Sequence, residues 1–142
     1  MFLPKTGKKT LTLPIENSSI LGIGEDVTFY EKGKVVNHAG SWKAYENGNR
    51  PGLIMPGDPK VGMKYYQELA PDIAMDRAEI ISISETIKTP YGELKHCVKT
   101  KESSPIDPVE EYKIYAPGIG LVQDQDMKLI RYGYIKGTTS QK

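Results

Sequence analysis

Short runs of alternating apolar and polar residues, each closed by a turn sequence, restrict this chain to a β structure. The clearest run is Tyr-Lys-Ile-Tyr-Ala-Pro-Gly-Ile-Gly-Leu-Val at positions 112–122. Tyr112 and Ile114 alternate with Lys113, which is the two-residue period of a half-buried strand. Pro117 has no N–H group to donate to a ladder, so we expect one strand before it and a second strand after it.

The same pattern recurs along the chain and predicts a series of strands. A hairpin is expected over 26–38, with its tight turn at Lys32 and Gly33. Positions 75–87 favour a strand in which Ile81, Ile83 and Ile87 share one face, because β-branched residues are less suited to a helix, which is the alternative. Further strands are expected over 10–13, 40–45, 63–69, 93–100, 112–116, 121–122 and 127–136. The segment 51–59 is bracketed by Pro and Gly, and we expect it to be a loop that packs on the core.

Composition places these strands in one domain. A chain of 142 residues can bury a core of its own, and its 14 glycines, 10 prolines and nine tyrosines suit a turn-rich sheet protein. We therefore predict a single β domain over 1–142, with a weakly patterned N-terminal segment (1–23) and a frayed polar tail (137–142). The predicted fold is all-β: one antiparallel, strongly curved sheet or half-open barrel of about seven to nine strands with minor helix.

Charge and hydropathy exclude some classes of partner. The chain has 19 Lys and Arg against 18 Asp and Glu, a net charge of +1, so no nucleic-acid partner is expected. No apolar run approaches the ~20 residues of a membrane span. The start, Met-Phe-Leu-Pro, lacks the apolar region and cleavage site of a signal peptide, so the sequence alone leaves the location open.

Groups that could carry catalysis are few. His38, His96 and Cys97 are the only imidazoles and thiol. Neighbours in a strand point to opposite faces, so His96 and Cys97 are not expected to form a dyad. The histidines and the cysteine also lack the spacing of a zinc site, and we expect no metal and no cofactor. A hydrolase that combines His38 or His96 with the carboxylates at 72–79 is the alternative to a non-catalytic protein.

Aromatic side chains are the remaining resource for binding. Tyrosine and tryptophan on a curved sheet can line an apolar groove while their polar atoms reach water. The predicted function is therefore a non-catalytic binding or structural module whose concave sheet face accepts a lipid or another amphiphile. The expected lining residues are Trp42, Tyr66, Tyr112 and Ile114.

Several blocks of sequence, in this order and spacing, resemble a family of bacterial secreted or lipoprotein-like β proteins of unassigned function. The blocks are Gly-Glu-Asp-Val (24–27), Tyr-Glu-Lys-Gly-Lys-Val-Val (30–36), Gly-Ser-Trp-Lys-Ala (40–44), Pro-Gly-Leu-Ile-Met-Pro (51–56), Asp-Pro-Lys-Val-Gly (58–62), Thr-Pro-Tyr-Gly (89–92), Lys-Thr-Lys-Glu (99–102) and Tyr-Ala-Pro-Gly-Ile-Gly-Leu-Val (115–122). The resemblance covers positions 24–122.

The resemblance implies a curved antiparallel sheet, loosely similar to lipoprotein-carrier folds, and a periplasmic or secreted location. It supplies no catalytic residue. Members of the family usually carry a further N-terminal β portion, whereas positions 1–23 of this chain match nothing in it. If those strands complete the family's sheet, this chain exposes strand edges, and a homodimer or a protein-interaction module that pairs through sheet edges is a further alternative.

Overall fold

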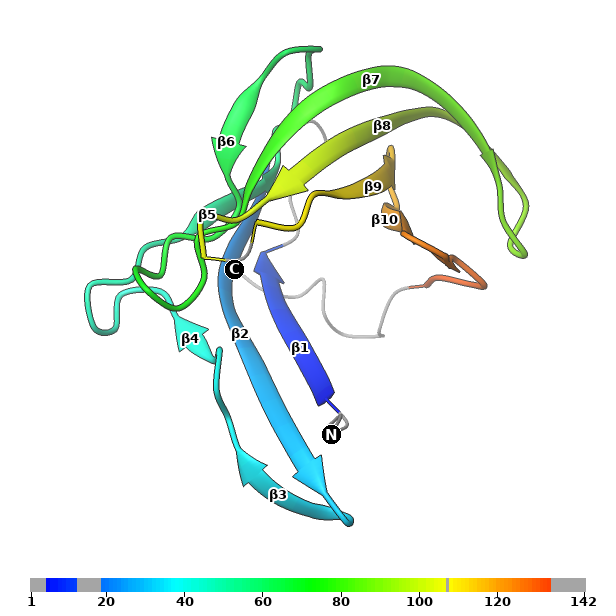
Figure 1. The fold of residues 1–142 in the computed structure, drawn as a ribbon. Coiled ribbons are helices and arrows are strands. Elements are labelled where there is room, and N and C mark those ends of the chain that lie inside the picture. Colours follow the sequence, from blue (N-terminus) through cyan, green and yellow to red (C-terminus); the bar gives the residue numbers. More distant parts are fainter. Residues whose placement is uncertain (1–4, 13–18, 107, 134–142) are drawn as a thin grey trace.

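The computed structural model describes residues 5–12, 19–106 and 108–133 of the chain. These residues form eleven strands and no helix, and every strand pair is antiparallel (Figure 1). The predicted all-β antiparallel class is therefore confirmed. The strands are more numerous than expected and form a five-stranded and a six-stranded sheet instead of one sheet, and neither sheet closes on itself. The predicted polar tail at 137–142 lies outside the described residues.

The first sheet is built around one long strand, β2 (Ile20–Glu31). Its other members are β1 (Lys5–Thr12), β3 (Lys34–Asn37), β4 (Trp42–Lys43) and β5 (Gly52–Met55). β1 pairs with one edge of β2, while β5, β4 and β3 pair in turn with successive parts of β2. The predicted hairpin turn is confirmed: Lys32 and Gly33 have φ angles of 50° and 78°, the left-handed pair that matches the twist of a hairpin.

The expectation of a loop over 51–59 is wrong for its first half, because β5 is a buried strand that pairs with β2. Pro51 and Pro56 flank this strand and take no place in its ladder, so proline does not prevent the pairing. Gly52 is required there, since a Cβ atom at this position would overlap the backbone carbonyl of Gln67. Pro56 and Pro59 lie between β5 and the next strand, which belongs to the second sheet.

The second sheet is a simple meander in which each strand pairs with its neighbour in sequence. Its strands are β6 (Lys64–Tyr66), β7 (Arg77–Lys88), β8 (Glu93–Ser103), β9 (Glu111–Ala116), β10 (Gly120–Asp124) and β11 (Met127–Lys128). β7 and β8 are long and bend into an arch, with β9 and β10 following beneath it (Figure 1). The strand predicted over 75–87 is confirmed as β7. The strand predicted over 127–136 is reduced to the two residues of β11, and positions 134–136 lie outside the residues that the structure describes.

The arch is produced by bulges, which also change which side chains are buried. The β7–β8 register shifts at three places between Ile80 and Ile87, and each bulge bends a strand and interrupts its alternation. Ile80 is fully buried, whereas Ile81 and Ile83 are 37% and 42% exposed and Ile87 packs against the apolar cluster of Cys97 and Ile114. In β8, His96 adopts a φ of 56°, outside the β region that a regular strand requires.

The core consists of three apolar clusters. Ile54 and Met55 of the first sheet pack against Ile80, Val98 and Tyr115 of the second, which joins the two sheets. A second cluster lies within the arch and contains Cys97, Ile114, Ala116 and Val122, with Ile87 and Leu94 against it. A third contains Trp42, Ala44 and Ala70. In the part of the chain that the structure describes, no helix is long and apolar enough to cross a membrane.

Candidate ligand pocket and buried charge network

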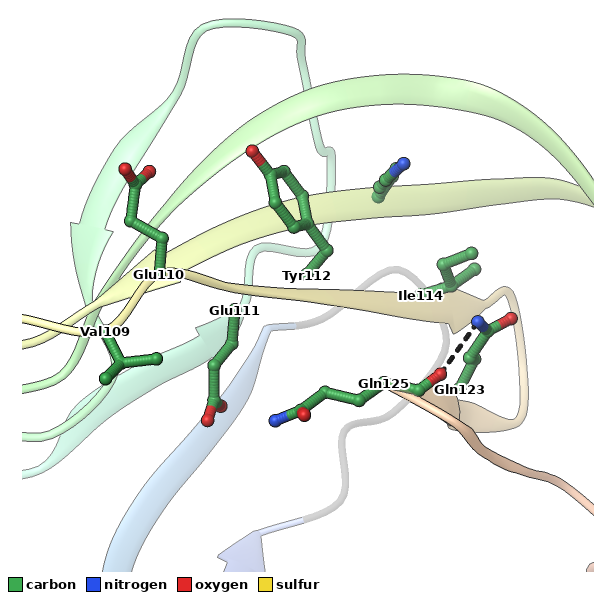
Figure 2. Close-up of a pocket in the computed structure, with 8 residues that line it drawn as sticks. Val109, Glu110, Glu111, Tyr112, Ile114, Gln123 and Gln125 are labelled. Carbon is green, nitrogen blue, oxygen red and sulfur yellow. Dashed lines mark hydrogen bonds between the residues drawn. The ribbon is translucent and has the colours of Figure 1, made fainter.

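A surface pocket of about 260 Å³ lies on the second sheet where the ladder between β9 and β10 ends. The last pair of that ladder is Lys113 with Asp124, after which β10 turns away and leaves the start of β9 open. The lining residues are Lys99, Val109, Glu110, Glu111, Tyr112, Ile114, Gln123 and Gln125 (Figure 2). The pocket is therefore formed by a strand edge and the turn that leaves it.

The apolar part of the pocket is provided by alternate residues of β9. Tyr112 is 47% exposed, whereas Ile114 is buried and belongs to the cluster within the arch. The ammonium of Lys99 lies 5.2 Å from the centre of the Tyr112 ring, within the range of a cation–π contact. Figure 2 shows Glu110 and Tyr112 on one side of the β9 ribbon and Glu111 on the other.

The two carboxylates that line the pocket are compensated by lysines from outside it. Glu110 lies 3.4 Å from the ammonium of Lys101, and Glu111 lies 4.0 Å from that of Lys113. Lys99, by contrast, has no carboxylate within ion-pair distance among the residues that the structure describes. The uncompensated charge of the pocket is therefore positive and lies beside the Tyr112 ring.

The structure brings together two of the four predicted lining residues. Tyr112 and Ile114 line the pocket, but Trp42 and Tyr66 are absent from its lining. Trp42 is buried with Ala44 and Ala70. Tyr66 is exposed on β6, which is separated from β9 by two strands, or about 14 Å at the usual strand spacing.

Sequence reasoning missed Lys99, Gln123 and Gln125 as lining residues. Lys99 and Gln123 both lie opposite Ile114 in the ladders of the sheet. This adjacency depends on register, which alternation within one strand does not specify.

A buried charge network lies beside this pocket around Glu102 of β8, which is opposite the lining residue Glu111 in the β8–β9 ladder. Its Oε1 atom accepts hydrogen bonds from Gln67 Nε2 at 2.9 Å, Thr100 Oγ1 at 2.9 Å and Tyr115 Oη at 3.0 Å. Its Oε2 atom lies 2.9 Å from the ammonium of Lys113, whose side chain is 14% exposed. Both carboxylate oxygens thus have partners within the protein, which is the arrangement of a structural centre.

The protonation states follow from the same contacts. Burial by itself raises the pKa of Glu102, but the charge of Lys113 and the hydrogen bonds outweigh it, so the pKa lies below its ordinary value. Burial likewise acts to lower the pKa of Lys113, and Glu102 outweighs it and raises that pKa. Burial and then the Glu102 charge raise the pKa values of Tyr65 and Tyr115, which remain protonated. A smaller pocket of about 90 Å³ borders Glu102.

The candidate catalytic residues are not assembled. Nδ1 of His38 donates to the carbonyl oxygen of Val27 at 3.0 Å. His96 is exposed, while the neighbouring Cys97 is fully buried, and burial followed by the charge of Glu85 raises the pKa of its thiol. Over 5–12, 19–106 and 108–133, neither histidine forms an ion pair with a carboxylate. The same residues contain no group of three or more His, Cys, Asp or Glu side chains arranged to hold a metal ion.

Comparison with known proteins adds no assignment to this geometry. No family model, no curated protein and no solved structure matches the chain. The chemistry of the pocket therefore has to be argued from its own residues.

Proposed function

We propose that this chain is a non-catalytic binding module that accommodates the apolar part of an amphiphile in the pocket of Tyr112 and Ile114. One observation carries the proposal. Ile114 is shared between the pocket and the apolar cluster within the arch, so the floor of the pocket is continuous with the core. Binding pockets typically combine such an apolar floor with a few polar groups at the rim. Here Lys99, Gln123 and Gln125 would supply the polar groups.

The size of the pocket indicates how much of a ligand it can hold. Its volume of about 260 Å³ is just below the ~300–1,000 Å³ of typical small-molecule sites. A single alkyl chain segment fits this volume better than a bulky ring system. The open strand edge leaves the rest of the ligand in solvent.

Two exposed tyrosines provide a matched test. Tyr112 and Tyr66 are 47% and 41% exposed, and only Tyr112 lines the pocket. We expect Tyr112→Ser to weaken binding of Nile red and of single-chain amphiphiles, measured by fluorescence titration and by thermal shift. Tyr66→Ser should leave both unchanged. If the unmodified protein binds none of these probes, or if the two variants behave alike, the proposal is wrong.

We propose pairing through a sheet edge as a second candidate function. β3 pairs with β2 and with no other described strand, and all four of its residues are exposed, including Val35 and Val36. An uncovered edge with apolar side chains favours addition of a further strand. Light scattering over a range of protein concentrations should then show a dimer that Val35→Lys weakens. A monomer at every concentration would exclude self-association through this edge.

We further propose kinship with the bacterial secreted or lipoprotein-like β proteins, and with it an envelope-associated role. The strongly bent antiparallel sheet and the turns at Lys32, Gly92 and Gly118 support this proposal. Fractionation of native cells with an antibody against the chain tests it. Recovery of the protein in the cytosolic fraction would contradict the proposed location.

A further inference from the structure

We propose that the ligand of this pocket is a free single-chain amphiphile with one anionic headgroup, most simply a carboxylate, and that Lys99 binds that headgroup. The inference rests on the proposed function and specifies the class of ligand. Three features of the pocket carry it: the distribution of charge, the position of the lysine, and the charge of the surrounding rim.

The distribution of charge favours an anion. Glu110 and Glu111 each have a lysine partner, Lys101 and Lys113, that does not line the pocket. Lys99 has no such partner among the described residues. An anionic headgroup would supply the charge partner that Lys99 lacks among the described residues, whereas a neutral headgroup would not.

The position of Lys99 joins this charge to the apolar floor. Lys99 lies opposite Ile114 in the β8–β9 ladder, and its ammonium lies 5.2 Å from the centre of the Tyr112 ring. The ring face attracts the ammonium through its quadrupole and uses no lone pair, so the N–H groups of the lysine keep their capacity to donate. A chain lying along Tyr112 and Ile114 would thus bring its headgroup within reach of Lys99.

The same geometry disfavours a cationic ligand. Quaternary ammonium groups bind to aromatic faces, but Lys99 already lies over the Tyr112 ring. A second cation at this ring would be repelled by the lysine. Selectivity for an anion over a cation of the same chain length is therefore a direct consequence of the contact.

The rim disfavours an anionic membrane as the source of the headgroup. Glu110 is exposed beside the pocket, and Glu111 lies on the opposite side of the β9 ribbon. Lys99 is thus a single uncompensated cation next to an exposed carboxylate that is already paired with Lys101, and it does not form the cluster of several cations by which proteins bind an anionic bilayer. The free amphiphile is therefore the expected ligand.

Calorimetric titration with three probes of equal chain length tests the proposal: decanoate and decyltrimethylammonium below their micelle concentrations, and decanol below its solubility limit. We expect decanoate to bind most tightly, and its affinity to fall as ionic strength rises from about 0.02 to 0.5 M, because salt screens an exposed ion pair. Lys99→Met keeps the length of the side chain and removes its charge. It should reduce the affinity for decanoate about tenfold and leave that for decanol unchanged.

Two further variants serve as controls. Lys99→Arg retains the charge and should retain most of the affinity for decanoate. Lys95→Met removes an exposed lysine of the same strand that lies 3.9 Å from Glu93 and does not line the pocket, and it should change nothing.

The outcomes separate the two proposals. If none of the three probes binds, the proposed function itself fails. The role of Lys99 is overturned if decanol binds as tightly as decanoate, or if Lys99→Met leaves the affinity for decanoate unchanged. In either case the proposal that the pocket binds an amphiphile is retained. Binding to anionic vesicles without binding of monomeric decanoate would also overturn the inference, because it would identify a membrane surface as the partner.

Discussion

Replacement of Glu102 should destabilise the protein more than replacement of any exposed acid. The Glu102→Ala variant would leave Lys113 as a buried charge with no partner at 2.9 Å, and would leave Gln67, Thr100 and Tyr115 without their acceptor. Removal of one member of a buried ion pair costs about 3–5 kcal/mol. Domains of this kind are stable by only ~5–15 kcal/mol, so the loss would be a large fraction of the total.

Glu102→Gln is the milder form of the same change. The amide oxygen can still accept the three hydrogen bonds to Oε1, but an NH₂ group would face the ammonium of Lys113. Loss of the charge-assisted bond should cost about 1.5–3 kcal/mol. Combining Glu102→Gln with Lys113→Met should cost less than the sum of the two single changes, because the double variant leaves neither member of the buried pair charged without the other.

Glu110 provides the matched control for this prediction. It also pairs with a lysine, Lys101, at 3.4 Å, but both side chains are exposed. Glu110→Gln should therefore cost less than about 1 kcal/mol. Urea unfolding followed by far-ultraviolet circular dichroism and by the fluorescence of Trp42 measures all variants. Equal losses for Glu102→Gln and Glu110→Gln would refute the reasoning.

The same network predicts the acid limb of the stability profile. The pKa of Glu102 is lower in the folded protein than its ordinary value of 4.5, so the folded state binds fewer protons than the unfolded state in that range. The contribution of Glu102 is complete above pH 4.5 and is lost as the pH falls through the folded pKa. Wild type should therefore lose stability on acidification more steeply than Glu102→Gln, and parallel profiles would contradict the assignment.

Three further predictions test the fold. Gly52→Ala should destabilise the protein by about 1–3 kcal/mol in urea unfolding, because the added Cβ would overlap the carbonyl of Gln67, and a neutral result would show that β5 is misplaced. Ile80→Ala should lower the free energy of unfolding by about 2–5 kcal/mol, because Ile80 is fully buried. Ile83→Ala should change it by less than about 0.5 kcal/mol, because Ile83 is exposed. The reverse order would refute the bulged register of β7. The Cys97 thiol should react with a thiol-specific reagent only as fast as the protein opens, and rapid labelling of the native protein would contradict its burial.

Local steric rules were sufficient to predict the turns and the strands next to them. Gly33 and Gly118 tolerate the positive φ that a tight turn requires, and Pro117 cannot donate to a ladder. The hairpin of β2 and β3 and the break between β9 and β10 could therefore be located without knowledge of the rest of the chain. Tyr112 and Ile114 could be placed on one face for the same reason, since alternation is a property of a single strand.

Pairing between distant segments was decided only by the tertiary structure. β5 is a strand because its backbone pairs with β2, which lies about thirty residues earlier in the chain. The bulges of β7 and β8 depend on their register, which alternation cannot specify once a residue is inserted. Trp42 and Tyr66 were predicted to line the pocket from their residue type alone, and residue type does not determine which strands become neighbours.

Glu102 shows most clearly the difference between what the sequence determines and what the tertiary structure decides. In the sequence it ends a charged run that begins at Lys99, and such a run is typical of a solvated strand. In the fold, Gln67, Tyr115 and Lys113 surround it, and the nearest of these along the chain is eleven residues away. The sequence by itself determined where the backbone turns and which residues alternate, because these depend on local sterics. The burial of a charge depends on partners brought from elsewhere, so only the tertiary structure decided it.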